Sequence, residues 1–193
     1  MGAADDTSDV VYAWDKNLLN GLSLDEYGIK LDEKYSWINP GEGLVIRPLS
    51  SQDFDKGFTD VLSQLTRLGD VSKEDFQKRF YAMKASGGYY TLVVEDTEAD
   101  NGSGKIVGTG TLEVEQKFIH SCALRGRVEE VVIDKEYRGR KLGKLVLGLI
   151  TVLSKKLACY KTTLECKVEN IPFYGIFGYK EDPEKFMQLR FHD

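Results

Sequence analysis

The segment of this sequence best suited to chemistry is a loop between a predicted strand and a predicted helix. Residues 127–134 predict a strand ending in an apolar run, and from Leu142 onward apolar residues recur at helical spacing. Gly139 lies in the loop, and Gly143 lies in the first turn of the helix. Amides at a helix start lack intrahelical acceptors and sit at the positive end of the helix dipole, so this junction can bind phosphate oxygens. The basic residues clustered there also favour an anion, because cations are disfavoured at a helix start.

Two common phosphate-binding loops do not match this junction. A Walker loop has four residues before its Gly-Lys pair and then Ser or Thr, whereas here three residues separate Gly139 from Gly143, and Leu145 follows Lys144. A dinucleotide-binding fingerprint needs a glycine where this chain has Lys141. Residues 138–143 instead resemble the pyrophosphate loop of the GNAT superfamily, Arg/Gln-x-x-Gly-x-Gly/Ala, from which they depart at Lys141. The alternative for the loop alone is a basic, solvated first helical turn.

Length and composition favour one globular domain. The chain has 193 residues, 41% hydrophobic and 30% charged, enough for one hydrophobic core. A net charge of −5 argues against a protein that coats nucleic acid. The apolar runs are too short for a bilayer, and the acidic start lacks a secretory signal. We therefore expect a cytoplasmic protein with no nucleic-acid partner and no integral membrane span.

The cysteines and histidines form no metal-binding pattern. Cys122, Cys159 and Cys166 include no CxxC pair, and the chain has only two histidines. We expect free thiols and no metal.

The predicted elements describe an α/β (α+β) fold, a mixed central sheet flanked by helices. A polar arm, residues 1–40, precedes the domain of residues 41–193. Ser50 or Ser51 is expected to cap a first helix ended by Gly69, and Ser72 to cap a second ended at Gly87. The other expected elements are strands 44–49, 89–95, 105–115, 127–134, 160–167 and 186–191, a helix after Gly139 and a short helix at 170–178.

Further blocks of sequence resemble one family within the GNAT superfamily, the glucosamine 6-phosphate N-acetyltransferases. The blocks are 40–49, 117–122, 126–132, 142–144, 153–157, 159–161, 163–166 and 173–174. The resemblance implies the GNAT acyl-CoA N-acyltransferase fold and a homodimer. It also implies acetyl transfer from acetyl-CoA to the 2-amino group of glucosamine 6-phosphate, a step toward UDP-N-acetylglucosamine.

The resemblance also implies roles for individual residues. The implied catalytic residues are Tyr174 as proton donor to the leaving thiolate, Glu165, Glu130, and Val131 through its backbone N–H. The implied acetyl-CoA residues are Val131, Val132, Ile133, Arg138, Gly139, Arg140, Lys141, Leu142, Gly143 and Tyr174. The implied sugar-phosphate residues are Thr66, Lys117, Phe118, Ile119, His120, Glu129, Glu130, Val131, Tyr160, Lys161, Glu165 and Arg190.

Each of these roles has an alternative. Tyr174 could be a core aromatic residue of a helix, and Glu129 and Glu130 could form an ordinary exposed strand end. Two other functions also remain open, a GNAT enzyme with a different amine acceptor and a non-catalytic acetyl-CoA-binding protein. A basic acceptor would favour an acidic pocket, whereas Lys117, His120, Lys161 and Arg190 favour an anionic acceptor.

Overall fold

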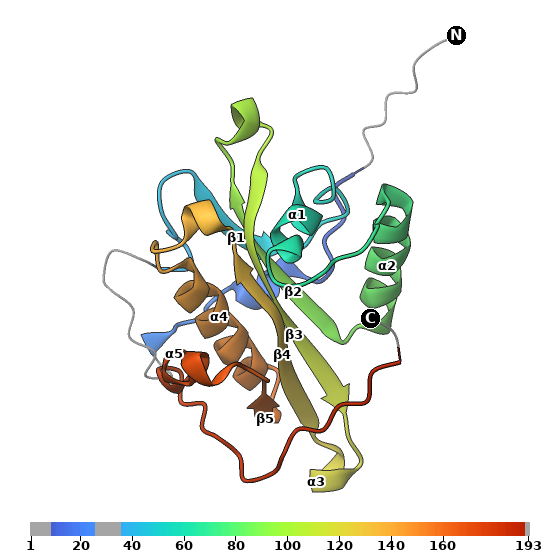
Figure 1. The fold of residues 1–193 in the computed structure, drawn as a ribbon, viewed down its shortest axis with the longest axis vertical. Helices are drawn as coiled ribbons and strands as arrows, with labels where there is room; N and C mark the ends of the chain where they lie inside the picture. Colours follow the sequence, from blue (N-terminus) through green and yellow to red (C-terminus); the bar gives the residue numbers. More distant parts are fainter. Residues whose placement is uncertain (1–8, 26–35, 192–193) are drawn as a thin grey trace.

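One five-stranded sheet forms the centre of the protein (Figure 1). The computed structural model describes residues 9–25 and 36–191. Its strands are β1 (Leu44–Pro48), β2 (Tyr89–Asp96), β3 (Lys105–Gln116), β4 (Leu124–Ile133) and β5 (Cys159–Thr163), side by side in that order. The first four strands pair antiparallel, and β5 pairs parallel to β4. The predicted mixed sheet flanked by helices is confirmed.

Helices cover both faces of the sheet, because neighbouring side chains of a strand point to opposite faces. Leu92 and Val94 of β2 pack in one core cluster with α4 (Leu142–Lys156), whereas Val93 packs in a second cluster with α1 (Phe58–Ser63) and α2 (Lys73–Ser86). In α4, 11 of 15 residues are buried. Core packing therefore fixes the position of α4 and of the loop at its start.

The shorter helical elements lie between the strands and at the two ends of the described chain. They are η1 (Lys16–Leu19), η3 (Asp100–Gly102), η4 (Lys135–Tyr137), η5 (Val168–Asn170) and α5 (Ile171–Gly175). The turn α3 (Ile119–Cys122) joins β3 to β4. Within the described residues, no helix is long and apolar enough to cross a membrane.

The described part of the predicted arm packs on the domain. Trp14 and Leu19 are buried in the core cluster of α4, and Trp14 Nε1 donates to the Thr91 carbonyl at 3.0 Å. Lys156, at the end of α4, donates to the carbonyls of Leu18 and Asn20 at 2.9 and 3.0 Å. The rest of the arm, residues 1–8 and 26–35, lies outside the described residues. The division into an arm 1–40 and a domain 41–193 stays a prediction.

The first helix begins later than the sequence predicted. Ser50 forms an isolated β-bridge with Tyr12, a turn begins at Ser51, and α1 starts only at Phe58 after Gly57, whose φ of 78° is left-handed. The buried carboxylate of Asp53 organises this turn, since it accepts hydrogen bonds from the Ser50 amide, the Ser50 hydroxyl and the Arg47 guanidinium at 2.7 to 2.8 Å. The helix also ends at Ser63, well before Gly69.

Elements with strong local signals appear as predicted. Helix α2 has the full capping box between Ser72 and Asp75 and ends at Gly87 in the left-handed conformation. Strands β2 and β3 form the predicted hairpin. The three cysteines are free. Strand β4 begins earlier than expected, at Leu124, and β5 ends earlier, at Thr163.

The predicted last strand, residues 186–191, is wrong for the single chain. The described residues after α5 form no strand, and Phe186, Met187, Leu189 and Phe191 are 64 to 90% exposed. A strand needs a neighbouring strand for its backbone hydrogen bonds, and this segment crosses in front of the sheet without pairing to it (Figure 1).

Candidate active site

A bulge interrupts β4 at Glu130 and Val131. Thr109 of β3 pairs with Val132, and Thr111 pairs with Glu129, so Glu130 and Val131 together oppose Gly110. Glu130 has a φ of 56°, which is left-handed and uncommon for a residue with a side chain. Such a bulge takes an extra residue out of the regular ladder and re-aims its backbone and side chain. The catalytic positions predicted at Glu130 and Val131 therefore lie where strand pairing is broken.

The same half of β4 has an open edge. Among the described residues, β5 pairs with β4 only from Leu124 to Arg127, while β4 continues along β3 to Ile133. The backbone of residues 128–133 on the β5 side is therefore free of a neighbouring strand. An extended chain with amide groups, such as pantetheine, can lie along such an edge. Val131 and Ile133, predicted to bind acetyl-CoA, are half-buried there, and Val132 points into the core of α1 and α2.

The predicted pyrophosphate loop follows directly from this edge. Gly139 has a φ of 82°, and a side chain there would meet no atom within 4 Å, so its backbone is open to a ligand. Lys141 caps α4 with a φ of 61°, a left-handed conformation that explains why many GNAT loops have glycine at this position. Leu142 is buried in the core, so only its backbone faces the loop.

The first turn of α4 leaves room for a ligand to approach. A methyl group on Gly143 would lie 3.7 Å from Ile133 Cγ1 and 3.8 Å from Phe173 Cζ, which are ordinary contacts. The exposed side chains of Arg138 and Arg140 lie beside this turn, and Arg138 Nε donates to the Ile133 carbonyl at 3.1 Å. Free amides, a helix dipole and two guanidinium groups together fit the pyrophosphate of acetyl-CoA.

Asp134 and Gln64 fix the start of the loop. The Asp134 carboxylate accepts hydrogen bonds from the Glu136 amide at 2.9 Å and from Gln64 Nε2 at 3.1 Å. Gln64 Oε1 in turn accepts the amide of Lys135 at 2.9 Å. Burial alone would raise the pKa of Asp134, but these hydrogen bonds, together with the charges of Lys105 and Lys135, outweigh it and the pKa is lowered. Gln64 thus links the end of α1, next to the exposed Thr66, to the predicted cofactor loop.

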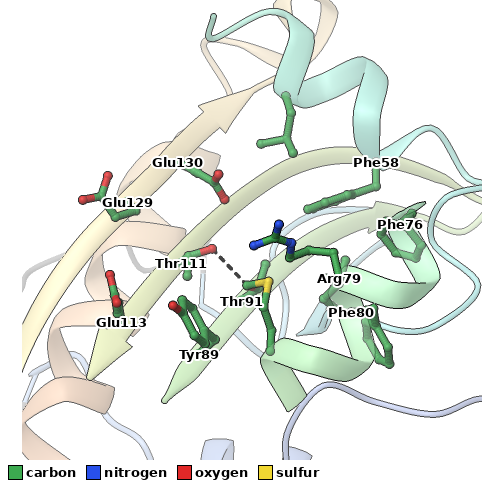
Figure 2. Close-up of a pocket in the computed structure, with 13 residues that line it drawn as sticks. Phe58, Phe76, Arg79, Phe80, Tyr89, Thr91, Thr111, Glu113, Glu129 and Glu130 are labelled. Atoms are coloured by element: carbon green, nitrogen blue, oxygen red, sulfur yellow. Dashed lines mark hydrogen bonds between the residues drawn. The ribbon is translucent and has the colours of Figure 1, made fainter. Parts of the chain in front are cut away.

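A cavity of about 460 Å³ lies between helices α1 and α2 and the bulged part of the sheet (Figure 2). Its helix side is mostly aromatic, with Phe58, Phe76 and Phe80. Its sheet side is polar and acidic, with Thr111, Glu113, Glu129 and Glu130. An acidic wall favours binding of an amine, and the bulge brings that wall to the open edge of β4.

Glu130 has the electrostatics of a proton acceptor. Its side chain is exposed at the mouth of the cavity, yet surrounding protein atoms desolvate the carboxylate enough to raise its pKa. The charge of Glu129 raises the pKa further, and a hydrogen bond with Thr111 opposes both effects. A carboxylate with a raised pKa is a better match to proton transfer near neutral pH.

Glu129 and Glu165 share one arginine. Arg127 donates to Glu129, and its other nitrogen donates to Glu165 at 2.8 Å. The structure therefore brings these two predicted residues together around Arg127, Glu129 from β4 and Glu165 from just after β5. It does not bring Glu165 into the cavity, whose lining includes Glu129 but not Glu165.

Tyr174 lies on α5, next to the predicted cofactor loop. Its neighbour Phe173 comes close to Gly143 of α4, and Tyr174 itself is half-buried against the core. Burial raises the pKa of Tyr174, and Cys166 adds to the increase. The phenol therefore stays protonated at neutral pH and can donate a proton. The alternative, that Tyr174 is only a core aromatic residue, accounts for its packing but not for its position next to the loop.

The remaining predicted sugar-phosphate residues gather at the other end of the sheet. The His120 ring lies 4.4 Å from the Tyr160 ring, Lys161 Nζ lies 5.8 Å from the same ring, and Lys117 pairs with Glu115. Phe118 and Ile119 are 95% and 61% exposed on the turn α3. We call residues 117–122 with Tyr160 and Lys161 the hairpin-tip group.

Within one chain, the hairpin-tip group lies outside the cavity that Glu130 lines. The group lies beside Leu124, which pairs with Cys159, and Leu124 is six positions before Glu130 in β4. That separation corresponds to about 20 Å, longer than a hexose phosphate. Arg190 lies in the exposed C-terminal segment.

Sequence reasoning missed Arg79. This residue extends from α2 into the cavity toward the strands (Figure 2). It is the only basic residue that lines the cavity within the described chain. Its spacing from Phe76, Phe80 and Met83 could have revealed it, since all four fall on one helix face. Among the described residues, no group of His, Cys, Asp or Glu could hold a metal ion.

Comparison with known proteins assigns the chain to a family. The model of the acetyltransferase (GNAT) family matches residues 57–179. A probable glucosamine 6-phosphate N-acetyltransferase of Drosophila melanogaster is 43% identical over 173 residues, covering 89% of this chain and 77% of the relative. Glucosamine 6-phosphate N-acetyltransferase of Arabidopsis thaliana is 40% identical over 137 residues, or 71% of this chain and 90% of the relative.

The fold agrees with this assignment. The crystal structure of glucosamine-6-phosphate N-acetyltransferase from Arabidopsis thaliana superposes with a TM-score of 0.70 at 36% identity, covering 79% of this chain and all of that chain. The chain therefore belongs to the GNAT acetyltransferase family, among relatives named glucosamine 6-phosphate N-acetyltransferases.

Proposed function

We propose that the protein transfers the acetyl group of acetyl-CoA to the 2-amino group of glucosamine 6-phosphate, giving N-acetylglucosamine 6-phosphate and CoA. One observation of the structure supports acetyl transfer to an amine most directly, and the relatives named glucosamine 6-phosphate N-acetyltransferases support this acceptor. At the bulge of Glu130 and Val131, the open edge of β4 meets a cavity with an acidic wall. The predicted anion-binding loop follows directly from that edge. The product is a precursor of UDP-N-acetylglucosamine, and the reaction belongs in the cytoplasm.

Acetyl-CoA supplies a thioester that an amine can attack directly, so no covalent enzyme intermediate is required. The amides of residues 139–143 and the side chains of Arg138 and Arg140 bind its pyrophosphate. The Val131 amide donates to the thioester oxygen as negative charge develops there, which stabilises the transition state.

Two side chains carry out the proton transfers of the reaction. Glu130 accepts the proton that the amine must lose, a role favoured by its raised pKa. Tyr174 donates to the departing sulfur, a role favoured by a pKa that burial keeps above its ordinary value. Glu165 acts indirectly, because it holds Arg127 at 2.8 Å and Arg127 also binds Glu129 in the cavity wall.

We also propose a homodimer in which the partner completes the sugar-phosphate site. The hairpin-tip group lies outside the cavity of Glu130, and the two backbones are about 20 Å apart along β4. Exposed apolar side chains cover both regions that would meet a partner, with Phe118 95% and Met187 90% exposed. Lys117, His120 and Arg190 then donate hydrogen bonds to the phosphate. Sedimentation at micromolar concentration should give the mass of a dimer, and a monomer would contradict this part of the proposal.

A thiol-release assay with acetyl-CoA tests the activity. Glucosamine 6-phosphate should release CoA much faster than unphosphorylated glucosamine, a polyamine or an N-terminal peptide. Faster release with a polyamine or peptide would instead identify a GNAT enzyme with another acceptor. Binding of acetyl-CoA without release for any amine would identify a non-catalytic acetyl-CoA-binding protein.

A further inference from the structure

Tyr137 is anchored to the sheet beside the predicted cofactor loop. It lies in η4, and its hydroxyl donates to Asp96 Oδ2 at 2.7 Å. Asp96 is itself held in place, because its Oδ1 accepts the amides of Glu98 and Ala99 at 3.0 and 3.1 Å. The hydrogen bond to Asp96 raises the pKa of Tyr137 to about 12. The ring of Tyr137 therefore has a fixed position between the end of β2 and the loop.

Arg140 lies over this ring. The centre of its guanidinium group is 4.6 Å from the Tyr137 ring centroid, within the range of a cation–π contact. The side chain of Arg140 is otherwise exposed, and an exposed arginine normally samples many rotamers. Stacking on an anchored ring restricts that freedom before any ligand binds.

We infer that Tyr137 is a positioning residue that holds the Arg140 guanidinium ready for the phosphates of acetyl-CoA. The inference rests on the proposed role of residues 138–143 in binding acetyl-CoA. Its physical basis is preorganisation, since a side chain that is already ordered loses less entropy when it binds an anion. Asp96 also contributes, because it fixes the ring and attracts the guanidinium, whose charge helps lower the pKa of Asp96 against the effect of partial burial.

Calorimetry with two ligands tests this inference. Acetyl-CoA carries the phosphates, and acetyl-pantetheine has the same thioester arm without them. Tyr137→Leu should weaken acetyl-CoA binding about two- to fivefold, the range given by one exposed cation–π contact. Its binding of acetyl-pantetheine should stay unchanged. Tyr137→Phe is the matched control, because it keeps the ring and loses only the bond to Asp96, so its loss should be smaller.

A double-mutant cycle shows whether the effect passes through Arg140. In an Arg140→Ala background, Tyr137→Leu should cause little further loss of acetyl-CoA affinity. An undiminished loss in that background would overturn the inference, and so would an equal loss for both ligands, which indicates general damage to the loop. Thermal unfolding of each variant checks that the fold is intact.

The same titrations separate this inference from the function on which it rests. If the wild-type protein binds acetyl-CoA no more tightly than acetyl-pantetheine, the loop does not bind phosphates, and both proposals fail. If the wild type prefers acetyl-CoA but the double-mutant cycle shows no coupling, only the role of Tyr137 fails.

Discussion

Removing the Thr111 hydroxyl should shift the pH dependence of the reaction. Thr111 is 3% exposed, its Oγ1 lies 3.0 Å from Thr91 Oγ1, and it hydrogen-bonds to Glu130. That bond stabilises the carboxylate and therefore lowers its pKa. The Thr111→Val change keeps the shape and removes the bond, so the pKa of Glu130 should rise. Glu130 acts as a base only when it is ionised. As the pH falls, the variant should therefore lose activity at a higher pH than the wild type does.

The size of this shift follows from the environment of Glu130. A hydrogen bond to a charged group contributes about 1.5–3 kcal/mol when both partners are buried. Because the Glu130 side chain is exposed at the cavity mouth, solvent screening reduces this to about 1 kcal/mol. Since 1.36 kcal/mol corresponds to one pH unit, the acid limb of kcat/KM should move up by roughly half to one unit.

The assay is the pH profile of kcat/KM for glucosamine 6-phosphate, with two controls. Thr91→Val removes a similarly buried hydroxyl with no contact to Glu130 and should move the limb less. Glu130→Gln should abolish the limb. The reasoning would be refuted by a limb that stays in place in Thr111→Val, or by one that survives in Glu130→Gln.

Four further changes test other parts of the structure. Gly143→Val should weaken acetyl-CoA binding by calorimetry at least about tenfold while leaving the fold intact by urea unfolding, because the first carbon of a side chain there meets only ordinary contacts at 3.7 and 3.8 Å, and an unchanged affinity would contradict the role of the loop. Tyr174→Phe should lower kcat by more than about tenfold with little change in either KM, since a leaving-group donor acts in the transition state, and a kcat within about twofold of wild type would contradict the role. Arg190→Ala should reduce kcat/KM for glucosamine 6-phosphate by about 2–3 kcal/mol but hardly affect glucosamine, so an unchanged ratio between the two would place the phosphate elsewhere. Asp53→Ala should cost about 3–5 kcal/mol in urea unfolding, because it leaves the buried Arg47 guanidinium without the carboxylate that it contacts at 2.7 and 2.8 Å, and a loss below about 1 kcal/mol would show that Glu95 alone suffices.

The sequence alone was sufficient wherever a structural signal is local. The capping box of α2 joins residues three positions apart, the β2–β3 hairpin follows from a polar turn between two apolar runs, and α4 follows from its helical apolar spacing. The strand, loop and helix around residues 138–143 were predicted for the same reason, and anion binding by this loop stays a prediction. The resemblance to one family supplied the acceptor and the roles of individual residues.

Contacts between distant residues decided the rest. The start of α1 depends on Asp53 meeting Arg47, and the bulge at Glu130 exists only in the register between β4 and β3. The open edge of β4 depends on where β5 stops pairing with it. The Tyr137 ring under Arg140 is held by Asp96, which lies at the end of another strand.

The C-terminal segment shows most clearly where local sequence is not enough to predict structure. Residues 186–191 alternate like a strand, yet a strand forms only where a second backbone supplies hydrogen bonds, and none of the described strands does so. Local sequence determines which conformations a segment favours. Only the assembled sheet determines which backbone groups find partners and which stay open to bind a ligand.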